Sequence, residues 1–234
     1  MLKIYFFRHG ETQWALSGQH SGRADLALTT NGEDEARQLG EKIQPIRFSH
    51  VFSSPLRRAQ ETCNQSGLLH QVEIDDDLSE WDSGDYEGKT EAEILAQRPD
   101  WNLFRDGFPN GETPTGISQR ADRLISKLKA LDGDIALFSH GDFGRVLGAR
   151  WIGLAVEHAQ SFLLNTASIS VLSYESDQSD QPVIVLWNSV GLDVIRETLN
   201  AKTFPTAIES PAIAEWENEG GEIPVLAQKK ELAE

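Results

Sequence analysis

Short apolar runs alternate with helix-like patterns along most of this 234-residue chain. The runs at residues 2–8, 50–54 and 134–139 have strand length, whereas residues 30–43 and 116–131 carry apolar side chains at helical spacing. This order is typical of a central sheet that is mostly parallel and covered by helices on both faces. The alternation predicts an α/β fold, a three-layer sandwich with one sizeable core.

Local signals predict where two of the helices begin. Thr30 followed by Glu33 predicts a capping box at the start of one helix. Ser54 before Pro55 predicts an N-cap and a first-turn proline for a second helix, which is expected to stop at Gly67.

The second half of the chain continues the pattern. Gly133 is expected to end the helix over residues 116–131, and another helix is expected over about 143–152. The later runs SISVLSYE and PVIVLWN have no helix-length pattern between them. They are predicted to pair as an antiparallel hairpin across the turn SDQSDQ.

The chain is expected to form one domain over residues 1–199, followed by an acidic C-terminal extension over 200–234. Residues 205–234 contain seven glutamates against two lysines, together with three prolines and the pair Gly220-Gly221. Such a composition predicts a peripheral or partly disordered segment. Two interpretations stay open: a solvated tail, or a lid or dimer contact in a homodimer.

The charge of the chain limits its partners. A formal net charge of −16 and a pI near 4.7 argue against nucleic acid or an anionic membrane, because the overall field repels polyanions. An anionic substrate would need a local cationic pocket. The lone cysteine, Cys63, fits a reducing compartment, and the first apolar run is interrupted at Arg8, too early for a signal peptide. We expect a cytoplasmic protein.

Two histidine-glycine pairs follow predicted strands. Arg8, His9 and Gly10 close the first apolar run, and the motif SHG at residues 139–141 closes another. Histidines at the carboxyl ends of neighbouring buried strands can meet over one small pocket. The arginine beside the first histidine indicates that this pocket holds a phosphate.

Five sequence blocks carry a resemblance to a known family. They are RHGETQW (8–14), SGRADLALTTNG (21–32), SSPLRRAQET (53–62), LSEWDSGDYEG (78–88) and ALFSHGDFGRVL (136–147). Their order resembles that of the histidine phosphatase superfamily, also called phosphoglycerate mutase-like. The resemblance implies the phosphoglycerate mutase-like fold, a phosphohistidine intermediate, and no metal or other cofactor.

The resemblance also implies roles for five side chains. His9 is similar to the nucleophile that accepts the phosphoryl group, and Arg8 and Arg58 to the two arginines that bind phosphoryl oxygens. His140 is similar to the second histidine, and Glu80 to the general acid and base. A lone strand-end histidine is more often structural, but here Arg8 and the distant SHG motif favour a catalytic role.

The same blocks imply a substrate-binding set. It comprises Arg8, Ser21, Gly22, Arg58, His140 and Gly141. Arg57 is expected to point away from the site, because neighbouring residues on a helix lie about 100° apart.

Several polar residues near the predicted site keep two interpretations. His20 and Arg23 would either reach a second anionic group of the substrate or lie in solvent. The acidic residues beside Glu80 would either take part or form a solvated face; they are Asp82, Asp85 and Glu87. Glu11 is expected to be a loop residue without a catalytic role.

Departures from the mutase pattern bear on the substrate. Ala15 follows Trp14 where the mutases of the family usually have asparagine, and the segment between Glu80 and His140, which includes Arg98 and Arg105, is short. Both features favour a phosphatase. The run SGQHSGRADLALT is similar to that of sedoheptulose-1,7-bisphosphatase-type members.

We therefore expect hydrolysis of a small phosphorylated metabolite, either a sugar phosphate or a phosphorylated sugar acid. The alternatives are a phosphoglycerate mutase, and a protein-directed phosphatase or phosphate-binding module with the acidic tail as a docking element.

Overall fold

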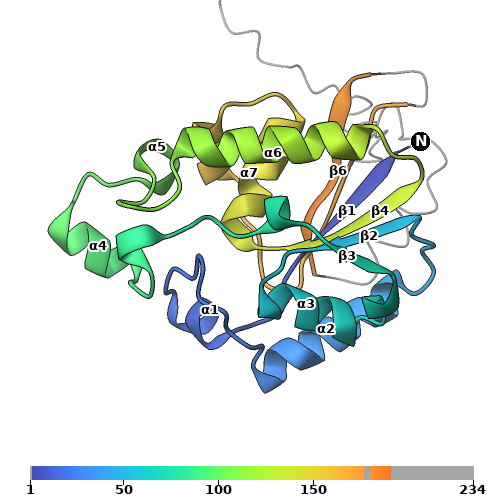
Figure 1. Ribbon diagram of the computed structural model, residues 1–234, viewed down its shortest axis with the longest axis horizontal. Coiled ribbons are helices and arrows are strands. Elements are labelled where there is room, and N and C mark those ends of the chain that lie inside the picture. Colours follow the sequence, from blue (N-terminus) through green and yellow to red (C-terminus); the bar gives the residue numbers. More distant parts are fainter. Residues whose placement is uncertain (1, 177–179, 191–234) are drawn as a thin grey trace, which may run out of the picture. The chain divides into compact units, whose positions relative to one another are not determined.

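A computed structural model describes residues 2–176 and 180–190 of the chain. Its centre is a six-stranded sheet in the order β3-β2-β4-β1-β5-β6 (Figure 1). The strands are β1 (Lys3–Arg8), β2 (His50–Ser53), β3 (Val72–Ile74), β4 (Asp134–Ser139), β5 (Ile169–Tyr174) and β6 (Pro182–Ser189). The first four in sequence run parallel to one another, while β5 and β6 are antiparallel to their neighbours. The predicted mostly parallel sheet and the antiparallel hairpin are confirmed.

Helices cover both faces of the sheet (Figure 1). The α-helices are α1 (Gln13–Ser17), α2 (Thr30–Ile43), α3 (Arg57–Gln65), α4 (Glu91–Gln97), α5 (Leu103–Asp106), α6 (Pro114–Lys129) and α7 (Gly141–Trp151). Short 3₁₀ helices span Leu69–Gln71, Asp76–Leu78, Gly84–Tyr86 and Val156–Ser161. The three-layer α/β class expected from the sequence is confirmed.

Alternation along β1 divides the core into two parts. Tyr5 and Phe7 pack toward α2 and α3, whereas Ile4 and Phe6 pack into the cluster that contains the apolar faces of α6 and α7. Successive strand residues point to opposite faces of a sheet, so a strand buried on both sides must be apolar throughout. This explains why the run at residues 2–8 shows no polar alternation.

Two predicted helix starts were wrong. The N-cap of α2 is Thr29, whose hydroxyl accepts from the Gly32 amide, so Thr30 is the first helical residue and makes no capping box with Glu33. Helix α3 begins at Arg57 instead of Pro55. The capping box in the described chain belongs to α4, at Thr90 and Glu93.

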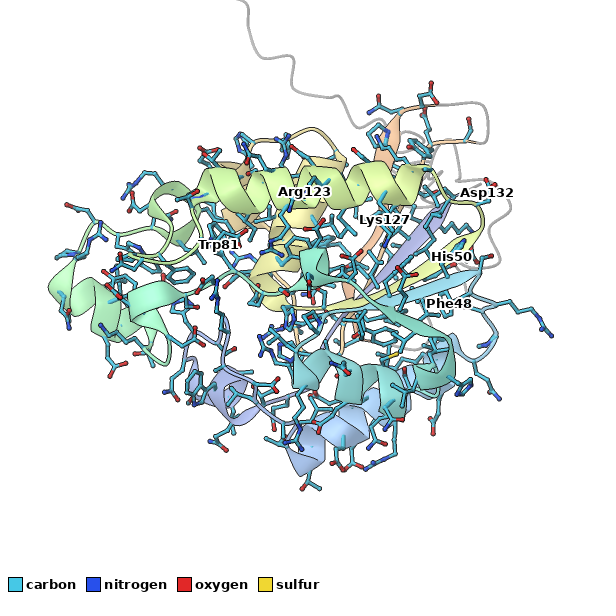
Figure 2. The ribbon with its side chains drawn as sticks, in the orientation of Figure 1. Phe48, His50, Trp81, Arg123, Lys127 and Asp132 are labelled. Carbon is cyan, nitrogen blue, oxygen red and sulfur yellow. The ribbon has the colours of Figure 1, made fainter. Side chains whose placement is uncertain are left out.

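Helix α6 begins earlier than expected, at Pro114, because the Thr113 hydroxyl caps it by accepting from the Gly116 amide. Its charged face binds the segment that follows β3. Lys127 lies on α6 (Figure 2), with its Nζ 4.4 Å from the centre of the Phe52 ring and 3.0 Å from Asp75 Oδ2. These contacts fix the chain from β3 onward against α6.

The segment between Asp82 and Thr113, where Arg98 and Arg105 lie, is compact, as expected from its length. Aromatic rings pack edge to face inside it, and Trp81 contacts both Phe104 at 5.6 Å and Phe108 at 6.1 Å between ring centroids. Arg105 is exposed and pairs with Asp106. The extension predicted over residues 200–234 lies outside the described residues. Within the described ranges, no helix is long and apolar enough to cross a membrane.

Helix α7 approaches β1 closely at Gly144. A Cβ atom there would lie 2.4 Å from a Phe6 ring carbon and 2.7 Å from a Leu164 methyl carbon. Gly144→Ala is expected to lower the free energy of unfolding by about 1–3 kcal/mol, because a packed core must shift to admit the methyl group. Urea denaturation measures this change.

The matched control is Gly116→Ala in α6, where the atoms nearest the added Cβ would belong to the side chains of Glu112 and Thr113, none of them closer than 3.3 Å. It is expected to change the unfolding free energy by less than about 1 kcal/mol. Equal stabilities for the two variants would contradict the close packing of α7 on β1.

Candidate active site

The parallel pairing of β1 with β4 creates the site. Arg8 lies opposite Ser139 in the register, so His9 and His140 leave the sheet side by side, and the His9 amide donates to the Ser139 carbonyl at 2.9 Å. The two imidazole rings are 5.3 Å apart between centroids. The sequence prediction that two strand-end histidines meet holds in the structure.

His9 is held as a neutral imidazole. Its side chain is only 3% exposed, and its Nδ1 lies 2.7 Å from the Gly10 carbonyl oxygen. A carbonyl can only accept, so Nδ1 carries the proton and Nε2 keeps its lone pair. Burial lowers the pKa of His9 well below its ordinary 6.5, and the charges of Arg58 and Arg8 lower it further. The ring is therefore neutral, and its Nε2 lone pair is free to bind an electrophile.

One turn of α3 fixes the loop that carries His9. The Gly10 amide donates to Thr62 Oγ1 at 3.0 Å, and the Thr62 hydroxyl donates to the Arg58 carbonyl at 2.7 Å. Arg58 and Thr62 are four residues apart, so they lie on one face of the helix. Thr62 was not predicted from the sequence, because its partner is 52 positions away.

Arg58 is fully buried behind the histidines. Its Nε donates to His140 Nδ1 at 3.0 Å, and its two terminal nitrogens donate to the carbonyls of Ala24 at 2.8 Å and Ser21 at 2.7 Å. Burial lowers its pKa to about 10, which still leaves it charged at neutral pH. Arg57 is exposed and pairs with Glu61, as the helical geometry predicted.

The bond from Arg58 sets the tautomer of His140. Nδ1 accepts from the guanidinium, so Nε2 carries the proton and donates to Ser54 Oγ at 2.7 Å. Burial lowers the pKa of His140 well below 6.5, with Arg58 as the next cause. The Ser54 hydroxyl was predicted to cap α3, but it is bound to His140 and to the Leu56 amide instead.

Arg8 lines the cavity and has donors that are not used in the described structure. Its guanidinium donates to the Leu164 carbonyl, and its Nε is buried without a hydrogen-bond partner in the described structure. Gly141 lies against this group: a Cβ there would be 3.3 Å from the guanidinium carbon. Burial lowers the pKa of Arg8, while the carboxylates of Glu80 and Asp142 act in the opposite direction.

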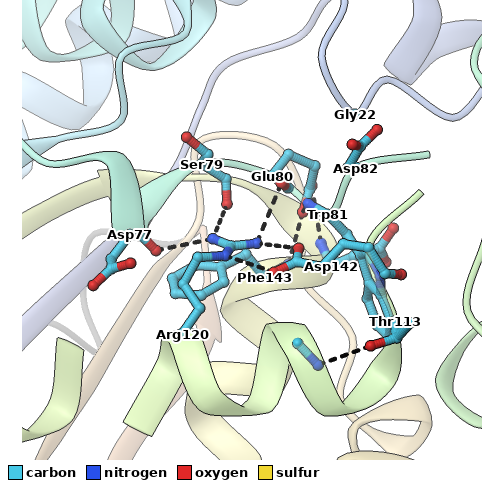
Figure 3. Close-up of polar contacts among 12 residues, drawn as sticks. Gly22, Asp77, Ser79, Glu80, Trp81, Asp82, Thr113, Arg120, Asp142 and Phe143 are labelled. Carbon is cyan, nitrogen blue, oxygen red and sulfur yellow. Dashed lines mark hydrogen bonds and ion pairs between the residues drawn. The ribbon is translucent and has the colours of Figure 1, made fainter. Parts of the chain in front are cut away.

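The side chain of Glu80 binds the N-terminus of α7. Its carboxylate accepts from the amides of Trp81 at 2.9 Å, Phe143 at 2.8 Å and Asp142 at 3.1 Å (Figure 3). Burial raises the pKa of Glu80, as does the nearby Asp142 charge, although the amide bonds and Arg58 favour the carboxylate. A carboxyl group with a raised pKa keeps its proton to higher pH than an ordinary glutamate, as a proton donor requires.

These groups border a cavity of about 200 Å³. Five of the predicted site residues line it: Arg8, His9, Ser21, Glu80 and Gly141. Its other lining residues are Ala15, Gln19, His20, Ser83, Asp142, Arg145, Leu163, Leu164 and Asn165. Of these, His20 was left open from the sequence as a substrate contact and Ala15 was noted as a departure from the mutase pattern; the others were not placed in the site from the sequence. Arg58 and His140 do not line this cavity, and Gly22 lines a neighbouring one that also reaches Glu80.

The electrostatics of the site favour an anion. Among the described residues, neither Arg8 nor Arg58 pairs with a carboxylate; their partners are backbone carbonyls and a neutral imidazole. Two guanidiniums that form no ion pair attract a dianion such as a phosphoryl group. The described residues also form no cluster of three or more His, Cys, Asp or Glu that could hold a metal ion.

The polar residues that the sequence left open fall into two groups, those that line the His9 cavity and those that are bound elsewhere. Arg23 pairs with Asp82 at 2.7 Å outside the His9 cavity, whereas His20 lines that cavity. Glu87 accepts from the amides of Arg23 and Ala24, and Asp85 accepts from the Asn110 amide group. Glu11 accepts from the Thr29 hydroxyl, in keeping with its expected structural role.

A neutral strand-end histidine beside two unpaired buried guanidiniums defines a phosphate-handling site. The chain matches the histidine phosphatase superfamily (branch 1) over residues 4–190. It is 32% identical to sedoheptulose 1,7-bisphosphatase of Saccharomyces cerevisiae, across 76% of this chain and 90% of that protein. It is 33% identical to an acid phosphatase of Mycobacterium tuberculosis, across 74% of this chain and 87% of that protein.

A solved structure agrees with these relatives. The α-ribazole phosphatase from Shigella flexneri superimposes with a TM-score of 0.72 at 28% identity, over 81% of this chain and 98% of that one. The chain belongs to the histidine phosphatase superfamily.

The raised pKa of Glu80 predicts a pH dependence. For an alkyl phosphate, kcat/KM is expected to fall as the pH rises through this pKa, because Glu80 then loses the proton that the leaving oxygen requires. On the acid side the rate is expected to persist, because the pKa of His9 is well below 6.5.

The matched variant is Asp142→Asn, which removes a negative charge beside Glu80 and should move the basic limb to lower pH. Ionisation of the substrate phosphate is the same for both enzymes, so the difference between their pH–rate profiles isolates Glu80. An unmoved basic limb would contradict this assignment.

Proposed function

We propose that this protein hydrolyses the phosphate ester of a small metabolite through a covalent phosphohistidine at His9. The observation that carries this proposal is the neutral Nε2 of His9, which shares one cavity with Arg8 and Glu80. A nucleophile, a cation and a proton donor are the groups that phosphate ester hydrolysis requires. Each is supplied by a side chain, so the mechanism needs no metal.

The first half-reaction transfers the phosphoryl group to the enzyme. The His9 Nε2 lone pair forms the N–P bond as the P–O bond to the alcohol breaks, and Glu80 gives its proton to the departing oxygen. Arg8 donates to a phosphoryl oxygen through its free Nε, and Arg58 adds a second positive charge behind the ring. His140 donates its Nε2 proton to phosphoryl oxygen once its bond to Ser54 is exchanged.

The second half-reaction restores the enzyme. The Glu80 carboxylate takes a proton from water, whose oxygen forms a P–O bond as the N–P bond breaks. Phosphate leaves, Glu80 is again protonated, and His9 Nε2 regains its lone pair. The same carboxyl group thus acts as acid and then as base.

The cavity indicates the class of substrate. Beyond Arg8 its lining includes neutral polar side chains, among them Gln19, Ser83 and Asn165, and its one further arginine, Arg145, is paired with Asp142 at 3.2 Å. Amides and hydroxyls suit the hydroxyl groups of a sugar. Relatives named as sugar-bisphosphate and ribazole phosphatases support a sugar phosphate or a phosphorylated sugar acid as the substrate.

We also propose a cytoplasmic location, because the cysteine content fits a reducing compartment. The chain has a single cysteine, Cys63, which is buried in the core, and burial raises the pKa of its thiol to about 12. Such a thiol is a packing group and not a reactive one.

We also propose that the protein forms a homodimer, which a measurement of the oligomeric state in solution would test.

His9→Ala is expected to lower phosphate release by at least about 10³-fold, the scale of losing a covalent nucleophile. Steady-state phosphate release measures this loss, and acid-labile, base-stable phosphate on the wild-type protein after a quench detects the phosphohistidine. His70→Ala, at an exposed histidine far from the cavity, is the control and should keep wild-type activity. Normal turnover by His9→Ala would refute the mechanism.

A substrate panel distinguishes the classes that the sequence left open. In EDTA, sugar phosphates and phosphorylated sugar acids are expected to give a higher kcat/KM than phosphopeptides, because a cavity of about 200 Å³ admits a small alcohol. Preference for phosphopeptides would indicate a protein-directed enzyme. Isomerisation of 3-phosphoglycerate in place of phosphate release would indicate a mutase.

A further inference from the structure

Arg120 on α6 binds the backbone that carries Glu80. Its Nη1 donates to the carbonyls of Asp77 at 2.9 Å and Ser79 at 2.6 Å, and its Nη2 donates to the carbonyl of Glu80 at 3.3 Å (Figure 3). The Arg120 side chain is 10% exposed. One guanidinium therefore holds three carbonyls within four residues, the last of them on Glu80 itself.

The remaining donors of Arg120 bind Glu112. Nε and Nη2 donate to the two carboxylate oxygens of Glu112 at 2.9 and 2.6 Å. A guanidinium has five N–H donors, and five acceptors surround this one. The forked, planar geometry is specific to arginine, since a lysine ammonium is a single point with three donors.

Glu112 extends the same support to the residues after Glu80. Its carbonyl accepts from the Trp81 indole at 2.7 Å, and its amide donates to the Asp82 carbonyl at 3.0 Å. The Arg120–Glu112 pair thus binds the chain on both sides of Glu80.

Arg120 also packs against a residue that binds the Glu80 carboxylate. Its guanidinium carbon lies 4.5 Å from the centre of the Phe143 ring, and the Phe143 amide donates to Glu80 Oε1 at 2.8 Å. Arg120 does not line the His9 cavity but borders the adjoining one, which also reaches Glu80. Arg120 therefore contacts residues that hold Glu80 but does not reach the cavity that His9 lines.

We infer that Arg120 is the positioning residue for the general acid and base Glu80. This inference rests on the proposed function. By fixing the backbone before and after Glu80, Arg120 holds the carboxyl group where the leaving oxygen departs. Displacement of a catalytic group by about 1 Å can cost 10²-fold in rate.

A positioning role for Arg120 predicts a dependence on the leaving group that a purely structural role does not. An alkoxide is a poor leaving group and needs the proton of Glu80, whereas p-nitrophenolate leaves without one. kcat/KM reports only the steps through the first P–O cleavage, before water enters. A misplaced Glu80 therefore lowers kcat/KM for an alkyl phosphate and leaves it nearly unchanged for p-nitrophenyl phosphate.

The test compares Arg120→Lys with Arg150→Lys on both esters. Arg150 is a matched control: it binds both oxygens of Asp122, at 2.9 and 3.0 Å, and the Leu154 carbonyl at 3.0 Å, away from Glu80. For Arg120→Lys we expect a loss of about 10- to 100-fold on glycerol phosphate and less than about 2-fold on p-nitrophenyl phosphate. Arg150→Lys is expected to change neither value by more than about 2-fold.

A second variant keeps the test open if Arg120→Lys unfolds, as thermal melting would reveal. Glu112→Gln leaves Arg120 in place but weakens its anchor, and it should show the same ester dependence with a smaller loss. Equal losses on both esters, or no loss on either, would overturn the inference.

The inference and the proposed function fail in different ways. Wild-type enzyme that releases phosphate from neither ester, or His9→Ala that keeps its activity, would overturn the proposed function and with it the inference. An active wild type with a uniform loss in Arg120→Lys overturns the inference alone.

Discussion

The pairing of β1 with β4 is the constraint on which the site depends. Parallel neighbours present their carboxyl ends at the same edge of a sheet, and the register that places Arg8 opposite Ser139 also places His9 beside His140. A register shift by one residue would turn one histidine to the other face. The apolar side chains of both strands are buried between two helical layers, and their packing fixes that register.

The positive charge of the site comes from guanidiniums that folding removes from water. Taking a guanidinium out of water is unfavourable, and proteins commonly offset it with a carboxylate. Here backbone carbonyls and a neutral imidazole hold Arg58, and a carbonyl holds Arg8, so neither guanidinium is bound to a carboxylate. A chain with a net charge of −16 thereby keeps a local positive potential for a dianion.

The sequence predicted what depends on local pattern and on contiguous motifs. Five of the six described strands, the three layers and the meeting of His9 with His140 follow from apolar runs and from the residues just after them, whereas the three-residue β3 was not predicted. Predictions that relied on one polar side chain were less secure: the Ser54 hydroxyl was expected to cap α3 but binds His140, 86 positions away. Thr62 and Arg120 were missed for the same reason, since their partners come together only in the folded chain.

Glu80 shows how several weak influences combine to set the pKa of one carboxyl group. Three amides, two of them from the first turn of α7, stabilise its carboxylate, as expected at a helix N-terminus. Burial and the Asp142 charge favour the protonated form and raise the pKa. Because both effects vary steeply with position, the location of the backbone decides the chemistry. The rigid contacts of Arg120 with that backbone are therefore as much a part of proton transfer as the carboxyl group itself.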